Sequence, residues 1–208
     1  MTPEAVRKRV FLVGGILFAM MLAVSAVLFT REISRIQEEK TRRSEVMGEL
    51  PDFALVSQNG RSVGRSDLLG RVHVVNFFYT SCTGPSPVLT KKMAGLQEAW
   101  LDEQDIGYMS ITVDPERDTP TVLASYAAEN GAREGWVFLT GETERVHDVI
   151  RHGFRSPVYA ISGAEAIHHS LRFALLDKRG RVRAHLDAAS PTLVADAAPI
   201  VKRLLAEN

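Results

Sequence analysis

A strongly apolar run that ends just before the only cysteine constrains the fold more than any other feature of the sequence. The run, Val72–Tyr79, is rich in β-branched and aromatic residues, which is typical of a strand buried in the middle of a parallel sheet. Cys82 follows, and then Gly84, Pro85 and Pro87 lead into an amphipathic segment. Because proline is favourable in the first helical turn, we expect a helix to begin here. The sequence therefore places Cys82 between a central strand and a helix N-terminus, where open α/β sheets carry their chemistry.

Strand and helix patterns alternate through residues 51–208. The expected strands are 52–56, 72–79, 106–113, 137–140 and a hairpin of 171–177 with 181–187; the expected helices are 66–69, 87–100, 119–130, 142–152 and 190–208. We expect Thr119 and Ser190 to be N-caps, and Asn59-Gly60 to form a turn. This order predicts an α/β fold with a mixed sheet flanked by helices. An early strand followed by Cys82, together with a closing hairpin and helix, best fits a thioredoxin-like arrangement.

An uncharged segment near the N-terminus predicts one transmembrane helix ahead of this domain. Residues 10–30 carry no charge, and a helix of that length spans roughly 30 Å, the thickness of one hydrocarbon core. The basic cluster within residues 1–9 predicts a cytoplasmic N-terminus and an exported domain. A cleaved signal peptide is the alternative, because residues 23–26 have the small-x-small form, but that site lies inside the apolar run. The charge-rich residues 31–50 are expected to be a juxtamembrane linker.

Charge and cysteine content exclude two classes of function. The chain has 25 basic and 25 acidic side chains, so no overall basic surface indicates a nucleic-acid partner. One cysteine cannot form an intramolecular disulfide. Cys82 is therefore either a packing residue or a reactive or metal-binding thiol, and its position after the strand favours a functional thiol. The glycine and prolines that follow it indicate an exposed loop rather than core.

Three separate stretches resemble the signatures of the Sco/SenC family. Phe78–Pro87, FYTSCTGPSP, resembles the copper-site loop of that family, and Ile111–Thr119, ITVDPERDT, is similar to its second signature. His169-Ser170 ahead of a strand that ends in Asp177–Gly180 is similar to the third. The order and spacing agree, and the resemblance covers about residues 50–207.

This resemblance implies a function and a location. Members of the family carry a thioredoxin-like domain on the outside of the inner membrane, bind copper and help to assemble the binuclear copper centre of cytochrome c oxidase; some are thought to act as thiol–disulfide reductants. Their ligands are two cysteines in Cys-x-x-x-Cys-Pro and a later histidine. The resemblance therefore implies that Cys82 and His169 bind copper, with Cu(I) favoured by their softness.

The chain departs from the family pattern at Ser86, which stands where the second cysteine is expected. A serine hydroxyl is a poor ligand for Cu(I), so the site has at most one sulfur and its third ligand is unidentified. Ser86 can donate a hydrogen bond to the Cys82 thiolate or cap the following helix; we expect the cap.

Other candidate residues have two readings each. Successive side chains of an extended segment point to opposite faces, so only one of His168 and His169 can face Cys82, and the family pattern selects His169. Asp114 either orients a histidine or binds a cation, or it simply shapes a turn; both readings stay open. Asp118 is expected to shape a turn, and Met93 to lie in the core. The remaining histidines show no ligand spacing and are expected at the surface: His73, His147, His152 and His185.

Three hypotheses about function follow. The first is a membrane-anchored copper metallochaperone, favoured over an enzyme, that passes copper to a cytochrome c oxidase subunit or another cuproprotein. The second is a single-cysteine redox protein in which Cys82 attacks a disulfide or peroxide, with a partner thiol completing the cycle. The third is a degenerate relative that keeps the fold and binds a protein partner without metal.

Overall fold

The structure is a computed structural model that describes residues 20–25, 27–33, 46–161 and 166–207. The chain divides into two units, residues 1–45 and 46–208. Within the first unit, residues 20–25 and 27–33 are helical, and large apolar side chains such as Phe29 are exposed. Nowhere in the described ranges does a helix combine the length and the apolar character needed to cross a membrane. Residues 1–9, half of the expected anchor at 10–30 and most of the expected linker at 31–50 lie outside the described residues.

The second unit contains the strands and helices of the domain. Its elements are β1 (Gly48–Glu49), β2 (Ala54–Ser57), β3 (Ser62–Gly64), η1 (Arg65–Leu68), β4 (Val72–Phe78), α2 (Pro85–Ala99), β5 (Ile106–Thr112), α3 (Pro120–Glu129), β6 (Trp136–Thr140), α4 (Thr143–Asp148), η2 (Val149–Gly153), β7 (Val158–Ala160), β8 (Ile167–His169), β9 (Arg172–Leu176), β10 (Arg181–Asp187) and α5 (Leu193–Ala206).

Eight of the strands form one mixed sheet, as the sequence predicts. Their order is β1-β10-β9-β4-β5-β6-β2-β3, in which β4, β5 and β6 run parallel and the other pairings are antiparallel. The parallel pair β4–β5 runs in register from Val72↔Ile106 to Phe78↔Thr112. The carboxyl ends of these two central strands therefore meet at one edge of the sheet. A separate two-stranded sheet pairs β7 with β8.

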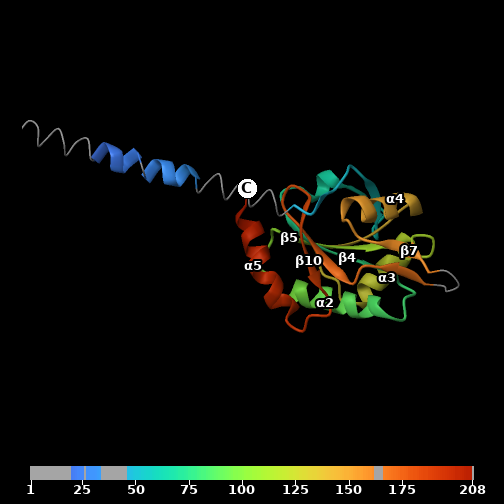
Figure 1. The fold of residues 1–208 in the computed structure, drawn as a ribbon. Coiled ribbons are helices and arrows are strands. Elements are labelled where there is room, and N and C mark those ends of the chain that lie inside the picture. The colour runs from blue at the N-terminus through green and yellow to red at the C-terminus, as the bar shows by residue number, and fades with distance from the viewer. Residues whose placement is uncertain (1–19, 26, 34–45, 162–165, 208) are drawn as a thin grey trace, which may run out of the picture. The chain divides into compact units, whose positions relative to one another are not determined.

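Helices cover both faces of the sheet (Figure 1). Helices α2, α3 and α5 lie on one face, and α4 lies on the other. Two hydrophobic clusters correspond to these faces, because alternate residues of β4 point to opposite sides. Val74 and Phe78 belong to the cluster that includes residues of α2, α3 and α5, whereas Val75 and Phe77 belong to the cluster with α4 and η2. All seven residues of β4 are buried, which confirms the prediction of a central strand.

Two local predictions differ from the structure. The compact unit begins at Val46, earlier than the expected start at 51, because β1 pairs with β10. Ser190 is not the cap of the closing helix, since α5 begins at Leu193 with Thr192 at the N-cap position. The Ser190 hydroxyl instead accepts the Thr192 N–H at 3.2 Å and donates to Asp196 at 2.6 Å. The capping chemistry is present there, but it shapes the turn ahead of the helix.

Candidate metal centre

A tight turn carries Cys82 away from the end of β4. The Cys82 N–H donates to the Tyr79 carbonyl at 3.3 Å, and α2 begins three residues later with Gly84 at its N-cap position. Ser81 and Thr83 on either side are exposed, but the Cys82 side chain is only 7% exposed. The loop is thus exposed as expected, but the Cys82 side chain itself is buried in a hydrophobic cluster, because the turn folds the thiol back toward the domain.

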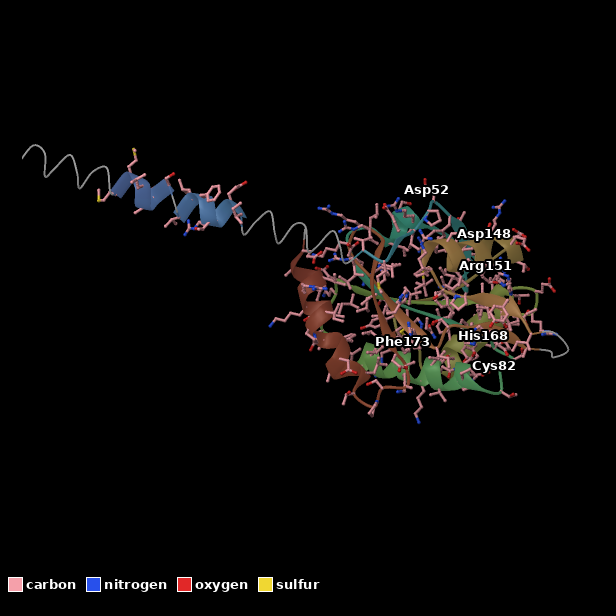
Figure 2. All side chains as sticks on the ribbon, in the orientation of Figure 1. Asp52, Cys82, Asp148, Arg151, His168 and Phe173 are labelled. Carbon is pink, nitrogen blue, oxygen red and sulfur yellow. The ribbon has the colours of Figure 1, made fainter. Side chains whose placement is uncertain are left out.

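The β7–β8 hairpin supplies the histidine. Val158 pairs with His169 and Tyr159 with His168, so the two histidines point to opposite faces of the hairpin. His169 is 4% exposed, whereas His168 is exposed and stacks on the Tyr159 ring at a centroid distance of 4.6 Å. In Figure 2 the labels of Cys82 and His168 fall at the same end of the domain, beside this hairpin. The expectation that one histidine faces inward is confirmed, and the inward one is His169.

Ser86 joins the cysteine to the histidine. Hydrogen bonding by its hydroxyl lowers the pKa of the Cys82 thiol, and its Oγ lies 3.4 Å from His169 Nε2. The same oxygen accepts the Tyr79 N–H at 3.3 Å, and the Ser86 side chain is completely buried. The expected role as a helix cap was wrong: α2 begins at Pro85, two residues earlier than expected, so Ser86 lies inside the first turn and its hydroxyl faces the site.

Tyr79 is a member of the site that the sequence did not indicate. Its ring meets the His169 ring edge to face at a centroid distance of 5.8 Å, and hydrogen bonding by its phenol contributes to the lowered pKa of the Cys82 thiol. Burial, together with the neighbouring Cys82, raises the pKa of the Tyr79 hydroxyl, so it remains a hydrogen-bond donor. Tyr79 ends the apolar run, and nothing in the sequence distinguishes it from the core residues before it.

The surroundings of Cys82 favour its thiolate. Burial raises the pKa of the thiol, but hydrogen bonds from the Ser86 hydroxyl, from the backbone of Ser86 and Gly84 and from Tyr79 outweigh that effect and lower it overall. Hydrogen bonds to the charged form stabilise it, as in other activated cysteines near helix N-termini. The thiolate is the form that binds metals and attacks electrophiles.

His169 is held as a neutral imidazole with one free lone pair. Its Nδ1 lies 3.2 Å from the Ser170 carbonyl oxygen, which can only accept, so Nδ1 carries the proton and Nε2 the lone pair. Burial is the main cause of a lowered pKa for His169, and the nearby His168 adds to it. A backbone partner on Nδ1 with Nε2 left open is the arrangement that metal-binding histidines adopt.

The donor set suits a soft cation of low coordination number. Ser86 has a single hydroxyl proton, yet it lies against both the Cys82 thiolate and the His169 lone pair. That proton satisfies one of the two acceptors, and a cation bound between them would satisfy the other. No group of three or more His, Cys, Asp or Glu side chains suited to a metal occurs among the described residues. Cys82 and His169 therefore offer a candidate centre one sulfur and one nitrogen.

The other candidates lie outside this cluster. Asp114 lies two residues beyond the end of β5 and pairs with Arg117 at 3.0 Å, which favours its role in the turn. Asp118 is completely buried, and it accepts hydrogen bonds from residues outside its own turn. Met93 lies in the core as expected, at 0% exposure. His73 was expected at the surface but is 6% exposed.

Comparisons with known proteins agree with this geometry. The SCO1/SenC family model matches residues 40–205. A SCO1 protein homolog of Bacillus subtilis is 30% identical over 64% of this chain and 71% of its own length. The copper-bound structure of Bradyrhizobium japonicum ScoI is 26% identical, with a TM-score of 0.62 over 76% of this chain and 99% of that one. BsSco, described as a member of the Sco family of cytochrome c oxidase assembly proteins, is 27% identical with a TM-score of 0.70 over 78% and 97%.

These matches bear on both fold and family. The mixed sheet with helices on both faces is a thioredoxin-like fold of the Sco type, as expected from the order of the elements. The family model covers the domain from before β1 almost to the end of α5. Together with the strand-to-helix cysteine and the hairpin histidine, this coverage shows that the chain belongs to the SCO1/SenC family.

Proposed function

We propose that this protein binds Cu(I) between Cys82 and His169 and delivers it to a cytochrome c oxidase subunit or another cuproprotein. One observation carries the proposal: the buried Ser86 hydroxyl lies 3.4 Å from His169 Nε2, and hydrogen bonding by the same hydroxyl lowers the pKa of the Cys82 thiol, so Ser86 links two residues far apart in sequence. The copper-bound relative and the oxidase-assembly relative support the identity of the ion and of the acceptor.

The chemistry of the pair suits Cu(I). Thiolate is a soft ligand, imidazole is a good ligand for copper, and the lowered pKa of each group favours the form that binds a metal. Hard divalent cations prefer several oxygen ligands, and no such set accompanies this pair in the described part of the chain. Cu(I) accepts two ligands, so the pair is sufficient to hold it.

The serine at position 86 sets the strength of binding and the redox behaviour. With a hydroxyl where the family resemblance implies a thiolate, the site has one sulfur ligand and holds the ion less tightly than a three-ligand site would. With one cysteine in the chain, no internal disulfide can form. Both properties favour a protein that carries and releases copper over one that reduces disulfides by itself.

Residues 10–30 serve in this proposal as a membrane anchor, with residues 1–9 in the cytoplasm, residues 31–50 as linker and the domain in the periplasm. Support comes from the uncharged segment itself and from the basic residues ahead of it. The exposed apolar side chains of the described helical residues, Phe29 among them, are consistent with a lipid-facing surface. An anchored chaperone would encounter a membrane-bound acceptor by lateral diffusion in the same membrane.

Competition for Cu(I) tests the proposal. The domain is titrated against a chromophoric Cu(I) chelator as wild type, Cys82→Ala, His169→Ala and His168→Ala. We expect one Cu(I) per wild-type domain, at least about tenfold weaker binding in the first two variants because each loses a ligand, and wild-type affinity in His168→Ala. The last variant is a matched control, since His168 is adjacent in sequence but faces away. Equal affinity in all four proteins would reject the site.

A second function rests on the lowered thiol pKa of Cys82. The thiolate would attack a peroxide oxygen, giving a sulfenic acid and releasing water, and an external thiol would reduce it back in two steps. The small exposure of the sulfur and the absence of a second cysteine in the chain disfavour this cycle. Peroxide consumption that depends on Cys82 and on added thiol, in a domain that binds no copper, would select it. A domain with neither activity would fit the third hypothesis, a partner-binding relative without metal.

A further inference from the structure

Asp118 is a buried carboxylate that neither the copper pair nor its own turn explains. It lies between β5 and α3, and its side chain is completely inaccessible to solvent. Neighbouring Asp114, in the same turn, pairs with Arg117 near the surface. Removing a carboxylate from water is energetically unfavourable unless hydrogen bonds inside the protein replace those to solvent. The question is therefore which groups compensate Asp118.

The partners of Asp118 come from the ends of the two central strands. The Asp118 carboxylate accepts the Thr80 N–H at 3.1 Å and also the Thr80 hydroxyl. The oxygen that accepts the Thr80 N–H, Oδ2, also accepts the hydroxyl of Thr112, the last residue of β5, and Oδ1 accepts the Thr80 hydroxyl. Burial raises the pKa of Asp118, and the threonine donors oppose that rise. One carboxylate thus ties the chain just beyond β4 to the carboxyl end of β5.

Thr80 lies inside the turn that carries the cysteine. The turn runs from Tyr79 to Cys82 and is closed by the Cys82 N–H donating to the Tyr79 carbonyl. Ser81, Thr83 and Gly84 around it are exposed, whereas Tyr79 and Cys82 at its two ends are buried in the hydrophobic cluster that also contains Phe77. The hydrogen bonds to Asp118 are the buried anchor on the β4 side of the loop, and α2 is the anchor on the other side.

We infer that Asp118 is a positioning residue for the copper site: it clamps the main chain at Thr80, so that Cys82 stays opposite Ser86 and His169. The effect on copper binding rests on the proposed function, whereas the clamp itself rests on the hydrogen bonds of Asp118 described above. Without the clamp, the turn gains conformational freedom, and the sulfur spends less time within reach of His169. Copper binding would then have to order the loop, and the conformational entropy lost would weaken the affinity.

Three variants and one control test the clamp. Asp118→Asn keeps the shape but offers one acceptor oxygen for three donors. Thr80→Val removes the hydroxyl donor, whereas Thr80→Ser keeps it. Asp114→Asn is the matched control, because it changes the same residue type in the same turn and the Asp114 carboxylate pairs with Arg117 instead of with Thr80.

Two readouts separate positioning from stability. Cu(I) affinity is measured by chelator competition, and the accessibility of Cys82 is measured in the metal-free domain as its alkylation rate above the thiol pKa. We expect Asp118→Asn and Thr80→Val to bind Cu(I) about 10- to 100-fold more weakly, the range found for supporting residues of metal sites, and to be alkylated faster. Thr80→Ser and Asp114→Asn should match the wild type in both.

The outcomes distinguish the two claims. If Asp118→Asn only lowers the melting temperature while affinity and alkylation rate stay at wild-type values, Asp118 is a structural residue and the inference is wrong. If Asp118→Asn does not fold, the Thr80 pair decides alone: equal behaviour of Thr80→Val and Thr80→Ser overturns the inference. If the wild type binds no Cu(I), the proposed function fails, and the alkylation rates still show whether the clamp holds Cys82.

Discussion

Replacing Ser86 with alanine should raise the thiol pKa of Cys82 by about one to two units. The Ser86 hydroxyl is the first of the groups that lower this pKa, and a hydrogen bond to a charged group contributes about 1.5–3 kcal/mol. One pKa unit corresponds to about 1.36 kcal/mol, which gives the predicted shift. Alanine also leaves the Tyr79 N–H without its acceptor at 3.3 Å, so stability should fall by about 1–3 kcal/mol.

The assay is the pH dependence of Cys82 alkylation, compared between wild type, Ser86→Ala and Ser81→Ala. Ser81 is an exposed serine in the same loop, so its replacement should leave the midpoint unchanged. Denaturant unfolding of the same proteins measures the cost in stability. A midpoint for Ser86→Ala that coincides with that of the wild type would show that the Ser86 hydroxyl does not lower the thiol pKa of Cys82. The role given to Ser86 in the site would then be wrong.

Three further predictions concern the site and the core. Ser86→Cys should supply a third soft ligand and tighten Cu(I) binding by at least about tenfold, and an unchanged competition endpoint would contradict this. His73, whose pKa is lowered by burial from 6.5 to about 4, remains neutral while the unfolded chain takes up a proton. The stability that this difference in pKa contributes is fully present above pH 6.5 and falls by about 3 kcal/mol toward pH 4. The free energy of unfolding of His73→Gln should therefore depend less steeply on pH over that range. Asp177→Asn removes a carboxylate 3.1 Å from the fully buried Arg183 and should cost about 3 kcal/mol of folding stability, read as a lower denaturation midpoint.

The central sheet could be predicted because its signals are local. Val72–Phe78 is apolar on both faces, and Thr119 followed by Pro120 marks the start of α3, where the Thr119 side chain accepts the Val122 N–H. Gly60 has a φ of 74° in the turn between β2 and β3, as the Asn-Gly pair predicts. In each case a few consecutive residues determine the structure, so no knowledge of distant contacts is needed.

The short strands could not be predicted, because tertiary pairing creates them. β1 consists of Gly48 and Glu49, which have low strand propensity and no apolar alternation, and it exists because β10 offers a free edge. β7 and β8 are three residues each and depend on one another. His169 was selected by family resemblance and by alternation along a strand, and the pairing of this hairpin then placed it inside.

Polar side chains at the site were the least predictable part. Ser86 and Asp118 were both assigned to local capping or turn chemistry, which is the usual role of these residue types near a helix start. Their actual partners come from other elements: His169 from the hairpin for Ser86, and Thr80 and Thr112 from the strand ends for Asp118. The register of β4 and β5 brings Thr80 and Thr112 to Asp118, and the β7–β8 pairing brings His169 to Ser86. The copper role of Cys82 and His169 stays a prediction.

X-ray absorption at the copper edge tests the central claim most directly. The domain is loaded with one equivalent of Cu(I) as wild type, Cys82→Ala and His169→Ala. We predict a first shell with one sulfur and imidazole nitrogen in the wild type, loss of the sulfur in Cys82→Ala, and loss of the imidazole scattering in His169→Ala. A wild-type spectrum without sulfur, or one that neither substitution changes, would show that copper does not bind between these two residues.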